Sequence, residues 1–163
     1  MDENITMQAG SIEDEMHGKY LTFFVESREY GIEIKYITEI ISVQGITPVP
    51  HTHGYLKGII NLRGTVVPVI DMRLRFSLPE IPYDDRTCII VVSMDEMTIG
   101  LIVDDVQEVV DIDDDHIQPP PAITPQNASN YFIRAIGQAG ASVKQLLDIE
   151  KVFGTGATIA VEA

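Results

Sequence analysis

Hydrophobic and polar residues alternate along many short stretches of the chain, with the period of a β-strand that has one buried face. Strands are predicted over residues 21–25, 30–34, 58–62, 65–71, 87–92, 97–103, 106–112, 131–136 and 142–149. A helical turn is expected near residues 37–41, where isoleucines recur three and four positions apart, before a further strand. Another is expected at Glu150–Phe153. The fold class is therefore all-β, with one or two short helical turns.

The same order of elements occurs twice in the chain. Residues 21–43 and 90–112 both contain a strand, a turn, a glycine-containing strand and an apolar stretch. Prolines follow in both cases, and then a hairpin that starts with tyrosine and ends with aspartate, at residues 55–71 and 131–148. This repeat predicts two small barrels that share a core, an arrangement that leaves few strand edges exposed.

Glycine and proline define the expected turns. The first of these hairpins turns at Arg63-Gly64, where Gly64 supplies a positive φ angle. Pro68 has no N–H to donate, which predicts that its strand is an edge or is bulged there. The last hairpin is predicted to turn across Gly137 and Gly140.

Acidic residues outnumber basic residues by 25 to 11, so the formal net charge is −14. This charge repels phosphate backbones and excludes nucleic acid as the partner. The longest strongly apolar run, residues 88–94, is far shorter than the roughly 20 residues that span a bilayer, so no membrane insertion is expected. The polar N-terminus does not resemble a signal peptide, and the single cysteine, Cys88, fits a reducing compartment. We therefore expect a cytoplasmic protein.

Candidate catalytic and metal-binding groups are sparse. The sequence has no nucleophile elbow and no phosphate-binding loop. His51 and His53 offer two imidazoles but no cysteine is near them. The acidic run at residues 111–115 resembles a calcium loop, yet His116 occupies the position that requires glycine. We expect neither an enzyme nor a cofactor.

One segment is basic against this acidic background. Between Lys57 and Pro79 there is a single acid, Asp71, and four basic residues. These basic residues are Lys57, Arg63, Arg73 and Arg75. Arg63 is the candidate for recognition because it lies at a hairpin tip, where its planar guanidinium could clamp a carboxylate. Glu39 is its counterpart, a charge among isoleucines that either faces solvent or meets a basic group.

At these residues the sequence resembles the CheW family of chemotaxis coupling proteins. The similarity is carried by Lys-Gly-Ile-Ile-Asn-Leu-Arg-Gly at residues 57–64, by Val-Pro-Val-Ile-Asp at 67–71 and by Tyr-Gly-Ile-Glu-Ile at 30–34. It extends over nearly the whole predicted domain. The spacing of these motifs makes the resemblance specific.

The resemblance sets the domain at residues 19–153, with approximate halves 19–83 and 84–153 between which strands are allowed to cross. A flexible acidic tail is expected at residues 1–18 and a C-terminal tail at 154–163. The implied fold is two five-stranded SH3-like barrels packed around a shared apolar core.

The implied function is a non-enzymatic adaptor that links the cytoplasmic tips of methyl-accepting chemoreceptors to the regulatory domain of the histidine kinase CheA. Such an adaptor is recruited to membrane-associated receptor arrays, and we expect it to be a monomer in isolation. The resemblance implies that Ile37, Glu39, Gly58 and Arg63 bind the receptor at the groove between the barrels. Kinase-binding residues stay unassigned.

Two alternatives stay open. One is a paralogue of the same fold that serves a non-flagellar signalling pathway. The other is a small β-barrel that binds a ligand or metal at His51, His53 and the acidic loop.

Overall fold

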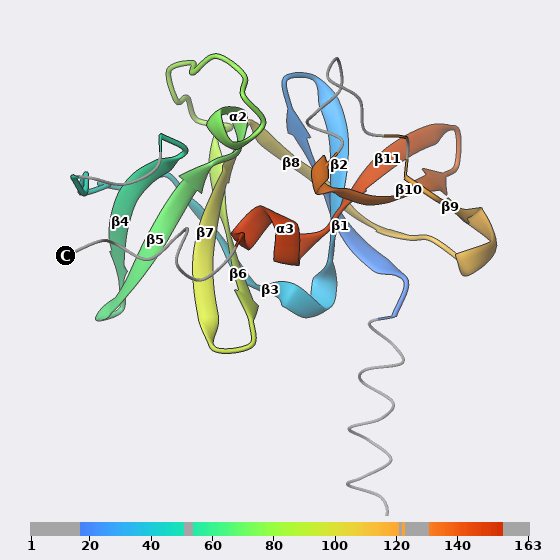
Figure 1. Cartoon of the computed structure of the whole chain (residues 1–163), viewed down its shortest axis with the longest axis horizontal. Helices are drawn as coiled ribbons and strands as arrows, with labels where there is room; N and C mark the ends of the chain where they lie inside the picture. The colour runs from blue at the N-terminus through green and yellow to red at the C-terminus, as the bar shows by residue number, and fades with distance from the viewer. Residues whose placement is uncertain (1–16, 51–53, 121, 123–130, 155–163) are drawn as a thin grey trace, which may run out of the picture.

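Two β-sheets lie side by side, each built from strands whose apolar residues face inward (Figure 1). The structure is a computed structural model that describes residues 17–50, 54–120, 122 and 131–154. The five-stranded sheet has the order β3-β6-β7-β5-β4, with β3 at Ile37–Ser42, β4 at Leu56–Leu62, β5 at Thr65–Asp71, β6 at Cys88–Met94 and β7 at Met97–Val103.

The six-stranded sheet has the order β8-β1-β2-β11-β10-β9. Its strands are β1 at Lys19–Val25, β2 at Arg28–Glu33, β8 at Asp105–Asp111, β9 at Ile117–Gln118, β10 at Ile133–Ala139 and β11 at Ser142–Leu147. The helical elements are the 3-10 turns η1 at Ile34–Tyr36 and η2 at Asp114–His116, and the helices α2 at Met72–Arg75 and α3 at Ile149–Phe153. The all-β fold class is therefore confirmed, with a sixth, two-residue strand in one of the two sheets.

Buried apolar residues form three clusters, which is the core that two packed barrels require. The largest cluster, the shared core, draws on both sheets and on both helices and includes Phe23, Ile32, Ile90, Leu101 and Phe153. A second cluster fills the five-stranded barrel and includes Ile60, Val67, Ile89 and Val91. A third fills the six-stranded barrel and includes Tyr20, Ile112, Ala135 and Leu146.

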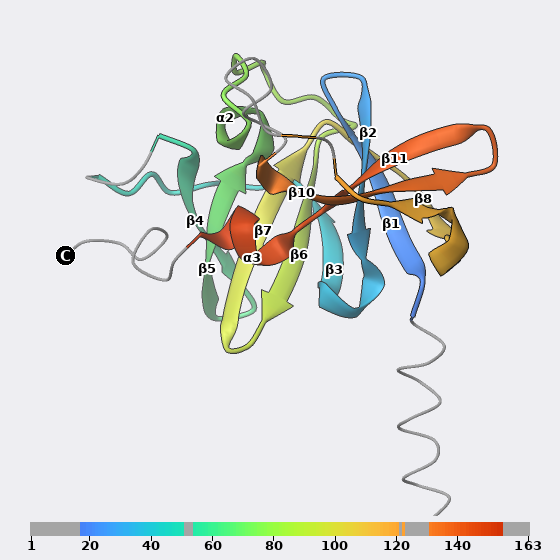
Figure 2. The same ribbon diagram turned by 45° about the vertical axis from the view of Figure 1, so that its right-hand side comes forward.

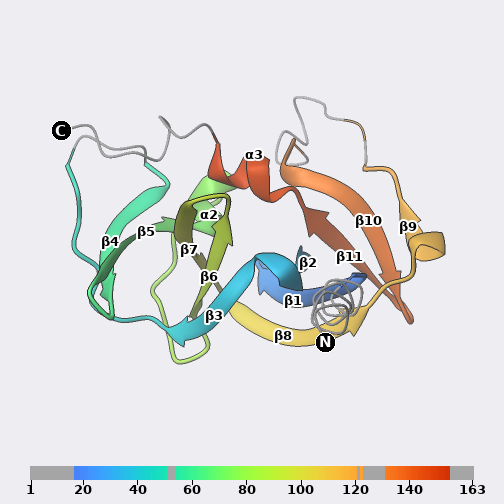
Figure 3. The ribbon, with the colours of Figure 1, turned by 90° about the horizontal axis from the view of Figure 1, so that it is seen from below.

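Strands are exchanged between the two parts of the chain. The hairpin β1–β2 pairs with β8 on one side and with β11 on the other, both of which come from the later part of the sequence. The hairpin β6–β7 in turn pairs with β3 and β5 from the earlier part. The chain passes from β7 of the five-stranded sheet directly into β8, which pairs with β1 in the six-stranded sheet (Figure 3).

Three details differ from the sequence expectations. The helical turn lies just before Ile37, because the residues from there onward pair with β6 as strand β3. Gly137 lies inside β10, and the last hairpin turns after it, at Gly140. Pro68 lies in an interior strand, which is possible because pairing of β5 with β7 begins only at Val69.

Among the described residues, no helix is long and apolar enough to cross a membrane. The predicted tails at residues 1–18 and 154–163 fall almost entirely outside the described residues, and so do His51 and His53.

Candidate functional site

Arg63 and Glu39 form an exposed ion pair at one end of the five-stranded barrel. Arg63 Nη2 donates to both carboxylate oxygens of Glu39, at 2.8 and 2.9 Å. Arg63 lies on the tip of the β4–β5 hairpin and Glu39 lies on β3, so the pair bridges the two edge strands of the sheet. The Arg63 side chain is 72% exposed and that of Glu39 is 26% exposed. The two residues singled out in the sequence therefore meet, and they stay accessible to a partner.

The hairpin turn holds Arg63 outward. Both turn residues have positive φ, 51° at Arg63 and 86° at Gly64, as a two-residue hairpin loop requires. The Asn61 side-chain oxygen accepts a hydrogen bond from the Gly64 backbone N–H at 2.8 Å. The predicted turn is confirmed, and Asn61 is the residue that stabilises it. Among the described residues, the Nε and Nη1 groups of Arg63 have no acceptor.

Ile37 belongs to the other side of strand β3. A bulge at Thr38 shifts the register, so that Ile37 lies opposite Val92 and Glu39 lies opposite Val91. Val92 belongs to the shared core and Val91 to the interior of the five-stranded barrel. Ile37 consequently packs against the shared core rather than beside the ion pair.

Gly58 is buried and has a structural role. It lies at a bulge in β4 with a φ of 150°, and a Cβ at this position would collide with the carbonyl group of Thr47. The backbone of Thr47 pairs with Ile59, through hydrogen bonds of 2.8 and 2.9 Å that close the barrel. Gly58 thus allows the segment before β4 to approach, and it supports the surface that carries Arg63 without being part of it.

Two exposed apolar side chains lie near the ion pair in the sequence, Ile40 one residue after Glu39 and Val66 three residues after Arg63, and the residue pattern had not singled them out. Val66 on β5 is 60% exposed and Ile40 on β3 is 42% exposed. Successive residues of a strand point to opposite faces, so Ile40 faces away from the side of β3 that carries Glu39.

The basic segment around Arg63 is not a free basic patch. Lys57 pairs with Glu80 at 2.5 Å and Arg73 pairs with Asp104 at 2.6 Å. Their side chains are only 28% and 14% exposed, and Arg75 donates to backbone carbonyls. Of the four basic residues, Arg63 alone is largely exposed.

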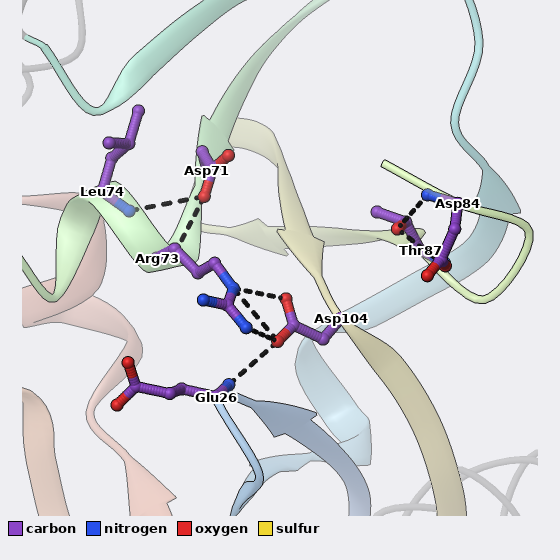
Figure 4. A network of polar contacts seen from close by, with 7 residues as sticks. All are labelled: Glu26, Asp71, Arg73, Leu74, Asp84, Thr87 and Asp104. Carbon is purple, nitrogen blue, oxygen red and sulfur yellow. Dashed lines mark hydrogen bonds and ion pairs between the residues drawn. The ribbon is translucent and has the colours of Figure 1, made fainter. Parts of the chain in front are cut away.

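Arg73 and Asp104 lie where the two sheets meet, in the network that Figure 4 shows. Arg73 Nε donates to Asp104 Oδ1 at 3.0 Å and Nη2 donates to Oδ2 at 2.6 Å. The same carboxylate accepts the backbone N–H of Glu26, in the β1–β2 turn, at 2.9 Å. Asp71 caps α2 by accepting from the backbone N–H groups of Arg73 and Leu74. The segment before β6 is closed by hydrogen bonds between Asp84 and Thr87.

The geometry of the exposed surface suits recognition of another protein. It combines a charge pair with unused arginine donors, which are typical of protein interfaces. Within the described residues, no group of three or more His, Cys, Asp and Glu side chains is arranged to hold a metal ion.

Comparison with known proteins gives a consistent result. A family model described as the CheW-like domain matches residues 19–156. The chemotaxis protein CheW of Klebsiella aerogenes is 33% identical over 137 residues, which is 84% of this chain and 82% of that protein. The CheW of Helicobacter pylori is 31% identical over 135 residues, or 83% of this chain and 81% of that protein. A crystal structure of the scaffolding protein TtCheW from Thermoanaerobacter tengcongensis superposes with a TM-score of 0.79 at 30% identity, covering 88% of this chain and 97% of that one.

Proposed function

The chain belongs to the CheW family, and from this premise we propose that it is an adaptor that couples methyl-accepting chemoreceptors to the histidine kinase CheA in chemotaxis. The observation that carries this proposal is the match of the CheW-like domain over residues 19–156, which includes every described strand and both helices. An adaptor acts by holding two partners in a fixed relation, so its function depends on surfaces and on rigidity rather than on catalytic groups.

We further propose that the receptor tip binds at the surface formed by Glu39 and Arg63, with Gly58 supporting it from within and Ile37 acting through its packing on the shared core. The receptor tip is a helical hairpin, and a helix that packs on apolar area is held in register by charged side chains beside it. Arg63 supports this role because two of its donor groups are unused among the described residues. Ile37 supports it indirectly, because its packing against the shared core holds the strand that carries Glu39.

The remaining partners follow from the family. The regulatory domain of CheA is the proposed kinase partner, and its contact residues are left unassigned. In the cell the protein is proposed to be a cytoplasmic monomer that is recruited to receptor arrays at the membrane.

Charge reversal tests the receptor surface. Arg63→Glu and Glu39→Arg each place two like charges next to each other in place of the native ion pair. A receptor that contacts this pair should then bind about 10- to 100-fold more weakly. Co-sedimentation with a receptor signalling fragment measures the binding, and circular dichroism checks that each variant keeps the native spectrum.

The double variant Glu39→Arg with Arg63→Glu is the matched control. It restores an ion pair inside the chain but presents it in reverse, so stability should recover while receptor binding stays weak. Unchanged co-sedimentation of both single variants would contradict the assignment of this surface. Failure of the native protein to bind either the receptor fragment or CheA would contradict the adaptor function itself.

A further inference from the structure

Helices α2 and α3 lie together between the two sheets, on the side away from β3 and β8 (Figure 3). Helix α2 follows directly from β5 of the five-stranded sheet, and α3 follows from β11 of the six-stranded sheet. Each is capped at its start by an aspartate, Asp71 at the end of β5 in one case and Asp148 directly after β11 in the other. A contact between these helices is therefore a contact between the two barrels.

Arg75, the last residue of α2, makes that contact. Its Nε donates to the carbonyl oxygen of Val152 at 3.1 Å and its Nη2 donates to that of Lys151 at 3.1 Å. Both carbonyls belong to the end of α3, where backbone acceptors lack partners within the helix. Arg75 thus caps a helix of the other barrel with two parallel hydrogen bonds.

Two aromatic rings enclose the same guanidinium. Its central carbon lies 4.2 Å from the ring centroid of Tyr55 and 4.7 Å from that of Phe132. Tyr55 immediately precedes β4, and Phe132 immediately precedes β10. One ring therefore comes from each barrel, and both rings contact the same guanidinium group. Only arginine combines a flat face for stacking with a fork of donors in that plane.

We propose that Arg75 is the positioning residue that fixes the angle between the two barrels. The inference rests on the proposed adaptor function, since that angle sets the relation between surfaces used by different partners. The apolar shared core holds the barrels together, but apolar burial is non-directional and permits small rotations. The hydrogen bonds and stacking of Arg75 are directional, and with the contacts of Asp104 to Arg73 and to the Glu26 N–H they select one orientation. The receptor surface lies on β3, on the opposite side of the same junction, where a rotation changes its alignment with the six-stranded barrel.

The angle is measurable because the two hairpin tips point to opposite ends of the molecule (Figures 1 and 2). Val66 near one tip is 60% exposed and Val143 near the other is 51% exposed, so both accept a spin label on an introduced cysteine. Cys88 is the single native cysteine and is replaced by serine. Pulsed electron spin resonance on this labelled protein gives the distribution of distances between the barrels.

The test compares Arg75→Gln with the matched control Arg134→Gln. Arg134 on β10 pairs with Glu33 at 2.8 Å, a contact inside the six-stranded sheet, so its loss removes an arginine without touching the junction. The expected result is a broader or shifted distance distribution for Arg75→Gln and a native one for Arg134→Gln. Arg75→Lys keeps the charge but not the flat fork, and it should behave like Arg75→Gln; it also serves if Arg75→Gln fails to fold.

Binding to the receptor fragment supplies the second measurement. Arg75→Gln should weaken co-sedimentation about 5- to 10-fold, the low end of typical coupling between linked sites. A native distance distribution in both Arg75 variants would overturn the proposal, whatever the binding result. If the native protein fails to bind the receptor, the proposed function is overturned, while the distance measurement still decides the role of Arg75.

Discussion

The hairpins β4–β5 and β10–β11 occupy the same place in the two barrels, yet only one of them carries a charged tip. Both have a bulge near the start of the first strand, at Gly58 and at Ala135, and both lead into an aspartate-capped helix. The first turns through Arg63 and the second turns through Gly140. The repeated backbone provides the fold, and only one copy carries an exposed charge pair at its hairpin tip.

The edge strands show the same contrast. Strand β3 pairs with β6 and β8 pairs with β1, and in each pair a bulge precedes a glutamate, Glu39 or Glu108. Glu39 is paired with Arg63, whereas Glu108 is exposed and forms no ion pair among the described residues. The asymmetry therefore extends beyond the hairpin tips.

The barrel interiors differ as well. Val67 lies inside the five-stranded barrel and is 1% exposed. The corresponding position of β11 is Lys144, also 1% exposed, and its ammonium group lies 3.1 Å from Glu29 and donates to Gln107 at 3.0 Å. These three residues come from β11, β2 and β8, so a polar contact connects three strands of the six-stranded barrel. In the five-stranded barrel, the corresponding position holds the apolar side chain of Val67.

The largest effect on stability is expected at Gly58 and Ala135, the residues that follow the two bulges, when each is replaced by the residue type of the other. Gly58→Ala places a methyl group against the Thr47 backbone and should lower the free energy of unfolding by about 3 kcal/mol or more. Ala135→Gly removes a small buried side chain and should cost only about 1 kcal/mol. Urea denaturation measures both. Equal losses would show that the close approach of Thr47 does not distinguish the two barrels.

The next effect concerns the buried lysine. Lys144→Ala leaves the Glu29 carboxylate without its partner and should lower the free energy of unfolding by about 2–3 kcal/mol, less than for a fully buried pair because Glu29 is 24% exposed. Lys144→Met fills most of the volume with an apolar chain and should lose clearly less. If Met is as destabilising as Ala, the lost charge pairing rather than packing dominates at this position. Thermal unfolding at neutral pH provides the comparison.

The smallest effect compares the two helix-capping aspartates. The Tyr83 hydroxyl donates to Asp71 at 2.7 Å, while Asp148 has no such tyrosine among the described residues. Tyr83→Phe should therefore cost about 1 kcal/mol at pH 7. Burial, followed by the hydrogen bond to Asp71, raises the pKa of Tyr83.

The raised pKa also gives the sign of a pH effect. The folded chain keeps the Tyr83 proton at a pH where the unfolded chain releases it, so this contribution is complete below pH about 10 and decreases as the pH rises further. Tyr83→Phe should flatten the decline of stability between pH 10 and 11 in a series of urea titrations. An identical decline in both proteins would exclude Tyr83 as a cause.

Much of this architecture could be predicted because strands and turns are local. Alternation identified nearly all the strands, and Arg63-Gly64 identified the tip of the first hairpin. Glu39 could be singled out because a charge among isoleucines is unusual. What could not be predicted depends on contacts between distant segments. Arg75 donates hydrogen bonds to the carbonyl groups of Lys151 and Val152, which lie 76 and 77 positions later in the sequence.

The role of Gly58 also depends on a contact with a distant segment of the chain. The family resemblance places it among the receptor-binding residues, but its environment is set by the Thr47 backbone, which pairs with β4 beside it. A bulge that moves Ile37 and Glu39 to different faces is likewise invisible in the residue pattern. Candidate residues could be named from the sequence, but the structure was required to show which of them are exposed and which are internal.

The exchange of strands between the sheets has a consequence for how the protein is made. Hairpin β1–β2 is synthesised before both of its neighbours in the sheet, because Tyr20 pairs with Val110 of β8 and Gly31 pairs with Leu146 of β11. Until those strands are made, both edges of the hairpin are open, a state prone to aggregation. The strands of the five-stranded sheet are all present once β7 is made, whereas the six-stranded sheet is completed only with β11.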